Sequence, residues 1–263
     1  RRREDMSERR KTRYCRVCGH ETKSLLCPND GVITVYRGAV RDDQLPYQPG
    51  DTINGRYELQ QVIGRGGHAV VYSARHVISG QPSALKVLLA DRSAPRSKAV
   101  KRFEREARVM SRLRHPNTMR IYDVGYTTEN RMFITMELLR GPNLEQVFAD
   151  QRLRDTSLHE AQALDIAIAV LGSLGEAHGH GLVHRDLKPA NIGLVAVHNE
   201  PTTVRVLDFG VVKTDNSTLT SHGIAPGTPA YMSPEQCRGT DVGHGADLYA
   251  LGAILFEAVA GVT

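Results

Sequence analysis

Alternating and helical spacings of apolar residues predict the regular elements of this chain. Residues from Tyr57 to Val62 alternate between polar and apolar side chains, as in a strand with one buried face, and Met132 to Leu139 predicts a second strand. Helical spacing runs from Ser97 to Leu113, and a longer apolar helix is predicted from Ala161 to Leu182. The apolar run from Leu248 to Val262 is also typical of a helix.

The composition is that of a globular protein with an uneven charge distribution. The chain has 263 residues, of which 40% are hydrophobic and 24% charged, so it can bury a sizeable core in one large domain or in a small module and a larger domain. Its formal net charge of +5 is concentrated at the start, where residues 1–13 hold seven basic and three acidic side chains. We expect residues 1–13 to form a disordered basic arm. Such an arm is more often a solvated tail than a ligand for anionic lipid or nucleic acid.

Neither a membrane span nor an export signal is predicted. No run of 18 apolar residues occurs and the N-terminus has no apolar signal core, so the expected location is the reducing cytoplasm. The four cysteines then favour metal binding or free thiols over disulfides. Because the chain starts without Met and stops inside an apolar helical run, we expect it to be a fragment, and a membrane anchor beyond Thr263 stays open.

A zinc site is predicted near the N-terminus. Cys15 and Cys18 form a Cys-x2-Cys-Gly knuckle, and Cys27 follows with eight residues between. Two short turns that offer ligands three positions apart are how a zinc ribbon surrounds a tetrahedral ion, and Asp30 stands where the fourth cysteine is usual. We therefore predict zinc at these four residues, with His20 as the alternative fourth ligand. A degenerate ribbon without metal is the competing interpretation, although a module this small depends on metal for its fold.

The predicted zinc-ribbon-like module covers residues 14–36 and closes with a strand from Val32 to Tyr36. Residues 37–55 hold prolines, glycines and several aspartates without apolar periodicity, and are therefore predicted to be a linker. Cys237, far along the chain, is predicted to be a lone thiol. The larger domain then begins at about residue 56.

Two short motifs in the second half of the chain indicate phosphoryl transfer. Residues 184–191 read His-Arg-Asp-Leu-Lys-Pro-Ala-Asn, and residues 208–210 read Asp-Phe-Gly. Moving a phosphoryl group needs a carboxylate to orient the attacking hydroxyl, a cation on the transferred phosphate and two groups that hold metal. In order and spacing, the two motifs resemble the catalytic and metal-binding loops of eukaryotic-like protein kinases, and the match is closest to the bacterial Ser/Thr kinases.

The resemblance implies a role for each polar residue of the two motifs. Asp186 would orient the acceptor hydroxyl and take its proton, and Lys188 would neutralise charge on the moving phosphoryl group. Asn191 and Asp208 would hold Mg²⁺. Asp247, in a segment that matches the following helix of the family, would brace the catalytic loop through backbone hydrogen bonds.

Further matches imply an ATP site. The stretch from Gly64 to Val71 resembles the glycine-rich loop over the phosphates, with Ala69 in place of the third glycine, and Lys86 would contact the α- and β-phosphates. Glu106 is assigned as the partner of Lys86, and Glu104, which faces another side of the helix, is the rival. The implied nucleotide-binding residues are Ile63, Gly64, Gly66, Gly67, Val71, Ala84, Lys86, Glu106, Met136, Glu137, Leu139, Asn191 and Asp208.

Residues 213–225 are rich in Ser and Thr and have the composition of an activation loop. Thr218, Thr220 and Ser221 are the candidate phosphorylation sites, and a loop without any modification is an equally supported interpretation of each. Arg185 can pair with a phosphate through a bidentate contact.

Residues 227–235 resemble the Gly-Thr-x-x-Tyr-x-Ala-Pro-Glu segment of the family, with Ser233 in place of Ala. Thr228 together with Lys188 indicates Ser or Thr, rather than Tyr, as the phosphate acceptor. Small-molecule kinases such as antibiotic phosphotransferases share the catalytic aspartates but lack this segment, which argues against that class.

The resemblance covers residues 56–263 and implies an α+β, bilobal protein-kinase fold with a β-rich N-lobe at about 56–140 and a partial helical C-lobe over 141–263. The implied function is that of a Ser/Thr protein kinase that uses ATP and Mg²⁺, acts on protein substrates and self-associates for autophosphorylation. A pseudokinase or scaffold, and a zinc-ribbon interaction protein, are the alternatives. Nucleic acid is not an expected partner, because Tyr14 and Tyr36 are the only aromatic residues of the ribbon that could stack on bases.

Overall fold

The computed structural model describes residues 13–15, 20–22, 28, 34–36, 45–65, 69–89, 98–195, 203–209 and 229–261. Two compact units make up the chain. Unit 1 comprises Arg1–Pro95 and Arg120–Pro142, and unit 2 comprises Arg96–Met119 and Asn143–Thr263. Residues 96–119 therefore group with the helical unit, whereas the sequence analysis placed them in the β-rich lobe.

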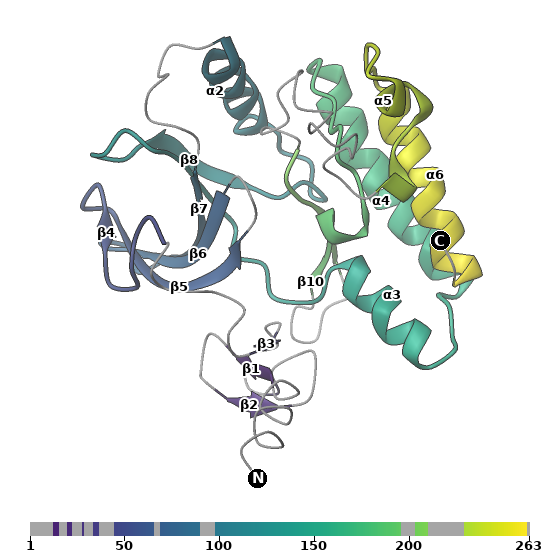
Figure 1. Cartoon of the computed structure of the whole chain (residues 1–263), viewed down its shortest axis with the longest axis horizontal. Helices are drawn as coiled ribbons and strands as arrows, with labels where there is room; N and C mark the ends of the chain where they lie inside the picture. The colour runs from purple at the N-terminus through teal and green to yellow at the C-terminus, as the bar shows by residue number, and fades with distance from the viewer. Residues whose placement is uncertain are drawn as a thin grey trace. The chain divides into compact units, whose positions relative to one another are not determined.

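Unit 1 contains a six-stranded antiparallel sheet with the strand order β4-β5-β6-β7-β9-β8 (Figure 1). The strands are β4 (Thr52–Ile53), β5 (Tyr57–Arg65), β6 (Ala69–His76), β7 (Pro82–Leu88), β8 (Ile121–Tyr126) and β9 (Met132–Met136). The predicted strand from Tyr57 is thus confirmed and extends to Arg65, and the second predicted strand ends at Met136.

Strand register separates the core face of this sheet from its other face. Val70, Val87 and Phe133 lie opposite one another on β6, β7 and β9, and all three are buried in the core of unit 1. Residues directly opposite on antiparallel strands share a face, and neighbours along a strand alternate. The side chains one position away, such as Val71 and Lys86, therefore belong to the opposite face of the sheet.

Residues 45–55, which the sequence analysis assigned to the linker, are part of unit 1. Ile53 pairs with Tyr57 at the sheet edge and is only 2% exposed within the core. The Tyr47 hydroxyl donates to Thr127 Oγ1 at 2.8 Å. Asn54 Nδ2 donates to the backbone oxygen of Tyr126 at 2.7 Å, which ties the turn after β4 to the end of β8. The linker prediction is wrong for this segment because a two-residue strand is too short to produce a visible alternation.

A separate three-stranded antiparallel sheet lies near the N-terminus, with the order β2-β1-β3. Its strands are β1 (Arg13–Cys15), β2 (Glu21–Thr22) and β3 (Thr34–Tyr36). The last strand agrees with the closing strand predicted for the ribbon. Cys18, Cys27 and Asp30 lie outside the described residues, as does the side chain of Cys15.

Unit 2 is mainly helical (Figure 1). Its elements are α2 (Lys98–Met110), α3 (Leu144–Leu153), α4 (Glu160–Gly179), η2 (Pro189–Asn191), β10 (Ile192–Val195), β11 (Thr203–Val206), η3 (Pro229–Tyr231), α5 (Pro234–Arg238) and α6 (Gly245–Ala260). The three helices predicted from sequence correspond to α2, α4 and α6. Each of α4 and α6 is followed within two residues by a glycine with positive φ, Gly181 and Gly261, which ends the helix.

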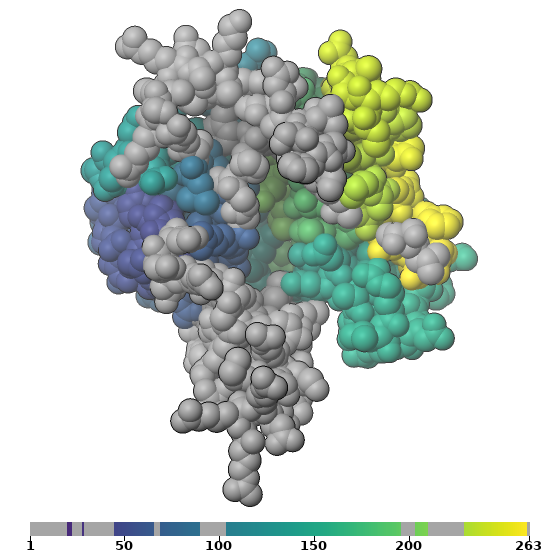
Figure 2. Space-filling model, viewed as in Figure 1, coloured from purple at the N-terminus to yellow at the C-terminus, as the bar shows by residue number. Residues whose placement is uncertain are grey.

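The buried side chains of α4 and α6 build the core of unit 2. Those of α4 recur every three or four residues and include Ile166, Val170 and Leu174, and α6 buries Leu251 and Ile254. Helix α6, drawn in yellow in Figure 2, also has apolar side chains on its exposed side. No described helix is long and apolar enough to cross a membrane.

Candidate functional site

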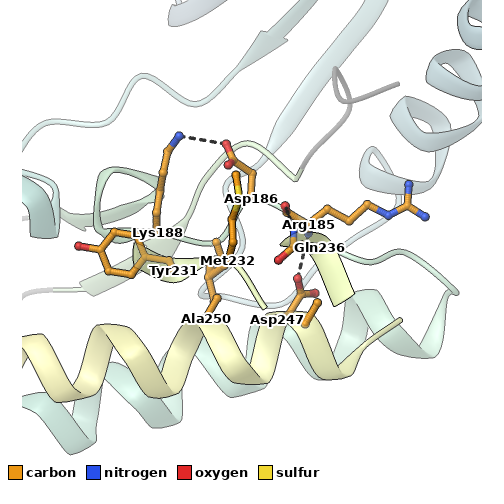
Figure 3. Close-up of a pocket in the computed structure, with 10 residues that line it drawn as sticks. Arg185, Asp186, Lys188, Tyr231, Met232, Gln236, Asp247 and Ala250 are labelled. Atoms are coloured by element: carbon orange, nitrogen blue, oxygen red, sulfur yellow. Dashed lines mark hydrogen bonds and ion pairs between the residues drawn. The ribbon is translucent and has the colours of Figure 1, made fainter. Parts of the chain in front are cut away.

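The loop that follows α4 presents an acidic and a basic side chain next to each other. Lys188 Nζ donates to Asp186 Oδ2 at 3.1 Å, and the two side chains are 26% and 25% exposed (Figure 3). Asn191 Nδ2 donates to the backbone oxygen of Asp186 at 2.7 Å, which closes the loop onto the short helix η2. A carboxylate and an ammonium group are thus held together where a ligand could reach both of them.

The buried carboxylate of Asp247 holds this loop in place through hydrogen bonds. Asp247, at the start of α6, is 1% exposed and accepts from the backbone N–H of His184 at 2.8 Å and of Arg185 at 2.9 Å. The side chain of His178, near the end of α4, contacts the same carboxylate at 2.8 Å. Arg185 has a φ of +62°, an unusual conformation for a residue with a side chain, and the two backbone hydrogen bonds that Asp247 accepts stabilise it. The bracing role of Asp247 was predicted from the sequence, whereas the contact made by His178 was not.

A glutamine of α5 fixes the loop from the other side. Gln236 Nε2 donates to the backbone oxygen of Arg185 at 2.7 Å. Its Oε1 accepts from the backbone N–H of Ser233, and Ser233 caps the N-terminus of α5. The serine that departs from the family pattern is therefore the N-cap of a helix. The Ser-x-x-Gln spacing is a capping-box signal, and could have indicated Gln236 from the sequence.

His184 is a structural member of the loop rather than an acid or base. Its Nε2 lies 2.8 Å from the backbone oxygen of Leu207, and Nδ1 accepts from the backbone N–H of Asp186 at 3.3 Å. These two bonds require the neutral ring with the proton on Nε2. Burial lowers the pKa of His184 below its usual value, which favours the same form. Its ring lies 4.8 Å from that of Phe209, centroid to centroid.

A backbone hydrogen bond connects the two segments that carry the residues predicted to hold magnesium, Asn191 and Asp208. The backbone N–H of Leu207 donates to the backbone oxygen of Asn191 at 2.9 Å, and Asp208 follows directly with a φ of +44°. Because Asn191 donates its side-chain N–H to Asp186, its amide oxygen points the other way. A carboxylate and an amide oxygen are ligands that a hard cation such as Mg²⁺ prefers, so the donor set fits that ion.

Arg185 also reaches the helix that carries the predicted partner of Lys86. Its Nη1 is 3.8 Å from Glu106 Oε1, and the two side chains are 25% and 20% exposed. In Figure 3 the Arg185 side chain extends away from Asp186 and Lys188. Arg185 Nε is buried and has no hydrogen-bond partner among the described residues. Within the described part of the chain, the guanidinium is therefore held by an ion pair at 3.8 Å, while the backbone N–H and oxygen of the same residue are both hydrogen-bonded.

Five of the nucleotide-binding residues predicted in unit 1 lie on the face of the sheet opposite to the core, namely Gly64, Val71, Ala84, Lys86 and Met136. Val71 lies between Gly64 and Lys86 in the register, and Ala84 lies opposite Met136. The face contains an ammonium group among small or apolar side chains, an arrangement that suits a flat base with an attached phosphate chain.

The segment after β9 contains two of the predicted nucleotide-binding residues, Glu137 and Leu139. The N–H of Glu137 donates to the backbone oxygen of Arg120 at 2.9 Å, so this N–H is already engaged within the unit. Ile63 and Leu139 are partly exposed in the same unit. Gly66 and Gly67 lie outside the described residues, as do Gly210, the candidate phosphorylation sites and Thr228.

A buried polar cluster supports the segment before α5, and no sequence motif pointed to it. Glu257 of α6 is 3% exposed, accepts from the Tyr231 hydroxyl and pairs with Arg152 Nη1 at 2.7 Å. Burial, followed by the neighbouring Glu257, raises the pKa of Tyr231. Tyr231 also lines a pocket with Asp186 and Lys188 (Figure 3). The cluster therefore fixes one wall of the space next to the acid–base pair.

Residues 57–263 match the family described as protein kinase domain. The serine/threonine-protein kinase pkn3 of Myxococcus xanthus is 41% identical over 222 residues, which are 81% of this chain and 39% of that protein. The DNA damage-responsive serine/threonine-protein kinase RqkA of Deinococcus radiodurans is 39% identical over 225 residues, which are 82% of this chain and 31% of that protein. The chain thus spans well under half the length of these curated relatives.

Solved structures of a protein kinase domain are also similar to this chain. The kinase domain of PknI from Mycobacterium tuberculosis aligns with a TM-score of 0.65 at 30% sequence identity, over 82% of this chain and 78% of that chain. A double mutant of the same domain aligns with a TM-score of 0.66 at 30% identity, over 83% of this chain and 78% of that chain.

Proposed function

Because this chain belongs to the protein kinase domain family, we propose that it provides the catalytic domain of a serine/threonine protein kinase. The reaction is transfer of the γ-phosphate of ATP to a Ser or Thr hydroxyl of a protein substrate. The observation that carries the proposal is the Asp186–Lys188 pair, 3.1 Å apart and held on a loop that Asp247 and Gln236 fix from two sides. Relatives named serine/threonine-protein kinases support the choice of acceptor.

The chain's own groups account for the proposed chemistry. Asp186 accepts a hydrogen bond from the acceptor hydroxyl, orients its oxygen toward the γ-phosphorus and takes up its proton as the new P–O bond forms. The bond between the γ-phosphorus and the β–γ bridging oxygen of ATP breaks in the same transfer, and ADP is the leaving group. Lys188, already beside Asp186, offsets negative charge on the phosphoryl group during transfer. Asn191 and Asp208 would hold Mg²⁺, which neutralises the phosphate oxygens when it is bound.

The proposed ATP site uses residues of the sheet face described above. Lys86 would contact the α- and β-phosphates, and Glu106 would fix the Lys86 ammonium. Val71, Ala84 and Met136 would enclose the adenine. The carbonyl of Glu137 would accept from the exocyclic amine of adenine, and the backbone of Leu139 would supply the matching donor. Ile63, Gly64, Gly66 and Gly67 would cover the phosphates.

Substitution of the proposed base tests this function. In a transfer assay with radiolabelled ATP, Asp186→Asn should reduce kcat by at least about 10³-fold, because the amide can neither accept the proton nor keep the charge of the carboxylate. Asp155→Asn, an exposed carboxylate elsewhere in unit 2, is the matched control and should retain the wild-type rate. Transfer by Asp186→Asn at the wild-type rate contradicts the mechanism. ATP binding by the wild type without any transfer supports the pseudokinase alternative.

We propose autophosphorylation of residues 213–225, a segment that lies outside the described residues. Thr218, Thr220 and Ser221 are the expected sites, and self-association would bring one copy's segment to another copy's Asp186. Mass spectrometry of the wild-type chain incubated with Mg-ATP should detect phosphate between residues 213 and 225. The Asp186→Asn variant should carry none when it is incubated alone, and should acquire it when wild type is added.

We propose that the N-terminal module binds zinc through Cys15, Cys18, Cys27 and Asp30, with His20 as the alternative to Asp30. The sequence spacing and the small sheet β2-β1-β3 support this, because eight strand residues cannot enclose a hydrophobic core of their own. Metal analysis of the whole chain should give about one zinc per molecule, and the double variant Cys15→Ser/Cys18→Ser should give none. Cys237→Ser, which removes the exposed free cysteine, is the control. Equal zinc content in all three proteins contradicts the site.

The role proposed for this module is contact with a protein partner. Base stacking has little support, because Tyr14 and Tyr36 are the only aromatic residues of the module. A module that binds single-stranded nucleic acid in a salt-dependent manner would contradict this choice.

A further inference from the structure

One carboxylate of α4 holds the segment that follows helix α2. Glu176 Oε1 accepts from the backbone N–H of Arg114 at 2.8 Å, and Glu176 Oε2 accepts from the backbone N–H of His115 at 2.8 Å. Both oxygens of the group are thus used, one for each of two consecutive peptide N–H groups. Charge-assisted bonds of this kind are roughly twice as strong as neutral ones and define both distance and direction.

Further contacts bind the same segment to α4. Thr118 Oγ1 and Ser173 Oγ are 2.7 Å apart in a buried pair. The ring of His115 lies against Gly172, where an added Cβ would be 2.6 Å from His115 Cε1. That close approach is open only to glycine, which accounts for Gly172 in the middle of a helix where glycine is otherwise unfavourable.

The segment is also bound to β11. Asn117 Nδ2 donates to the backbone oxygen of Val204 at 2.9 Å, and the backbone N–H of Met119 donates to the oxygen of Val206 at 3.0 Å. Residues 114–119 are therefore fixed on two elements of unit 2, and we name them the α2 anchor. Helix α2 ends at Met110, so only three residues separate the helix from its anchor.

The anchor determines where Glu106 stands. Glu106 lies one helical turn before Met110, which is 6% exposed, and the turn after the helix continues with Leu113, which is 4% exposed. Neither residue can move without opening the core. A displacement of the anchor is thus transmitted through residues 111–113 and about one turn of α2 to Glu106, whose carboxylate lies 3.8 Å from Arg185 Nη1 beside the proposed base.

We propose that Glu176 is a positioning residue for the phosphoryl transfer. Its carboxylate sets the place of α2 relative to the catalytic loop and thereby the position of Glu106. The inference rests on the proposed kinase function and adds to it a residue that contacts neither nucleotide nor acceptor. The amide of glutamine would keep the shape of the side chain. It offers one acceptor in place of two, and its NH₂ group would face a peptide N–H as donor against donor.

Steady-state kinetics of the full chain test the proposal. Glu176→Gln should lower kcat/KM for ATP by about tenfold, the factor that corresponds to the loss of one charge-assisted hydrogen bond, mainly through a higher KM. Asp165→Asn also converts a carboxylate to an amide, at an exposed position of α4, and should leave the kinetics unchanged. In a Glu106→Gln background, Glu176→Gln should have no further effect, because residues that act through one another are not additive. Additive effects, or an unchanged kcat/KM in the single variant, overturn the proposal.

A second variant and a structural measurement separate this role from a general loss of stability. Gly172→Ala should push the His115 ring away and reproduce the kinetic effect without removing any carboxylate. Hydrogen exchange should show faster exchange in residues 104–119 of both variants, with the rest of α4 as protected as in the wild type. Unchanged exchange in residues 104–119 of both variants overturns the proposal even if the rates fall. A wild-type chain without any transfer would instead overturn the proposed function itself.

Discussion

At the scale of single residues, the carboxylate of Asp247 organises the candidate site without belonging to its exposed surface. It accepts hydrogen bonds from His184 and Arg185 and contacts the ring of His178. Because the group is 1% exposed, no water can replace a lost acceptor. The position of Asp186 therefore depends on the buried charge of Asp247, which does not contact the substrate.

We expect Asp247→Asn to cost more stability than an ordinary surface change. The amide keeps one acceptor and places a donor against a backbone N–H, so the free energy of unfolding should fall by about 2–4 kcal/mol. Urea denaturation followed by circular dichroism measures this, with the exposed Asp241→Asn as control. A loss below about 0.5 kcal/mol, the range of neutral surface changes, would contradict the bracing role.

His184 predicts how stability depends on pH. Its pKa is lowered below the usual 6.5, chiefly by burial, so the unfolded chain binds this proton at a higher pH than the folded chain. The stability from the neutral ring is complete above pH 6.5 and is lost as the pH falls below that value. One such group changes the free energy of unfolding by at most about 1.4 kcal/mol per pH unit.

Denaturation at pH 7.5 and pH 5.5 tests this sign. The wild type should lose more stability over this interval than His184→Phe, which cannot take up the proton but is less stable at both pH values. His180→Gln, at the exposed histidine that follows the last residue of α4, should behave as the wild type does. An identical pH dependence in wild type and His184→Phe would show that the ring is not buried in its neutral form.

At the scale of secondary-structure elements, β4 provides a test of the boundary of unit 1. Ile53→Ala removes a core side chain that is 2% exposed and should lower the free energy of unfolding by about 2–5 kcal/mol. Ile78→Ala, at a residue that is 90% exposed, makes the same change at the surface and should cost less than about 0.5 kcal/mol. Chemical denaturation compares the two. Equal effects would mean that residues 45–55 are a linker after all.

Helix α5 has only five residues and is placed by its cap and by one bond to the catalytic loop. Gln236→Leu removes the bond from Nε2 to the backbone oxygen of Arg185 and weakens the cap. We expect kcat to fall by about tenfold while the free energy of unfolding falls by about 1 kcal/mol, because the loop loses orientation more than contact area. Arg238→Ala, exposed on the same helix, is the control. A fall in stability with unchanged kcat would make Gln236 a purely structural residue.

At the scale of the whole molecule, the kinase fold class predicted from sequence is confirmed by the family match and by the PknI structures. The motifs sufficed because each of them is a short segment in which residue type and spacing are both constrained by phosphate chemistry. The long helices were predictable as well, since a stretch such as Ala161 to Leu182 keeps its apolar character over many turns.

The residues that support the site could not be read from the sequence in the same way. Glu176 and His178 face different partners from neighbouring positions of α4, and each looks like an ordinary polar residue of a helix. Their roles depend on contacts with residues about 60 or more positions away, which no local pattern encodes. Ile53 was missed for a related reason, because a two-residue strand carries no periodicity.

The α2 anchor also affects the order in which the elements of the chain can fold during synthesis. All strands of the unit 1 sheet precede residue 142, so the sheet can form once this residue has emerged from the ribosome. The anchor, in contrast, pairs with Glu176 and Val206, which emerge some 60 to 90 residues after it. Helix α2 is therefore translated early, whereas the residues that bind its anchor are translated late. During part of translation, the apolar side of α2 can be covered only by other parts of the nascent chain or by a chaperone.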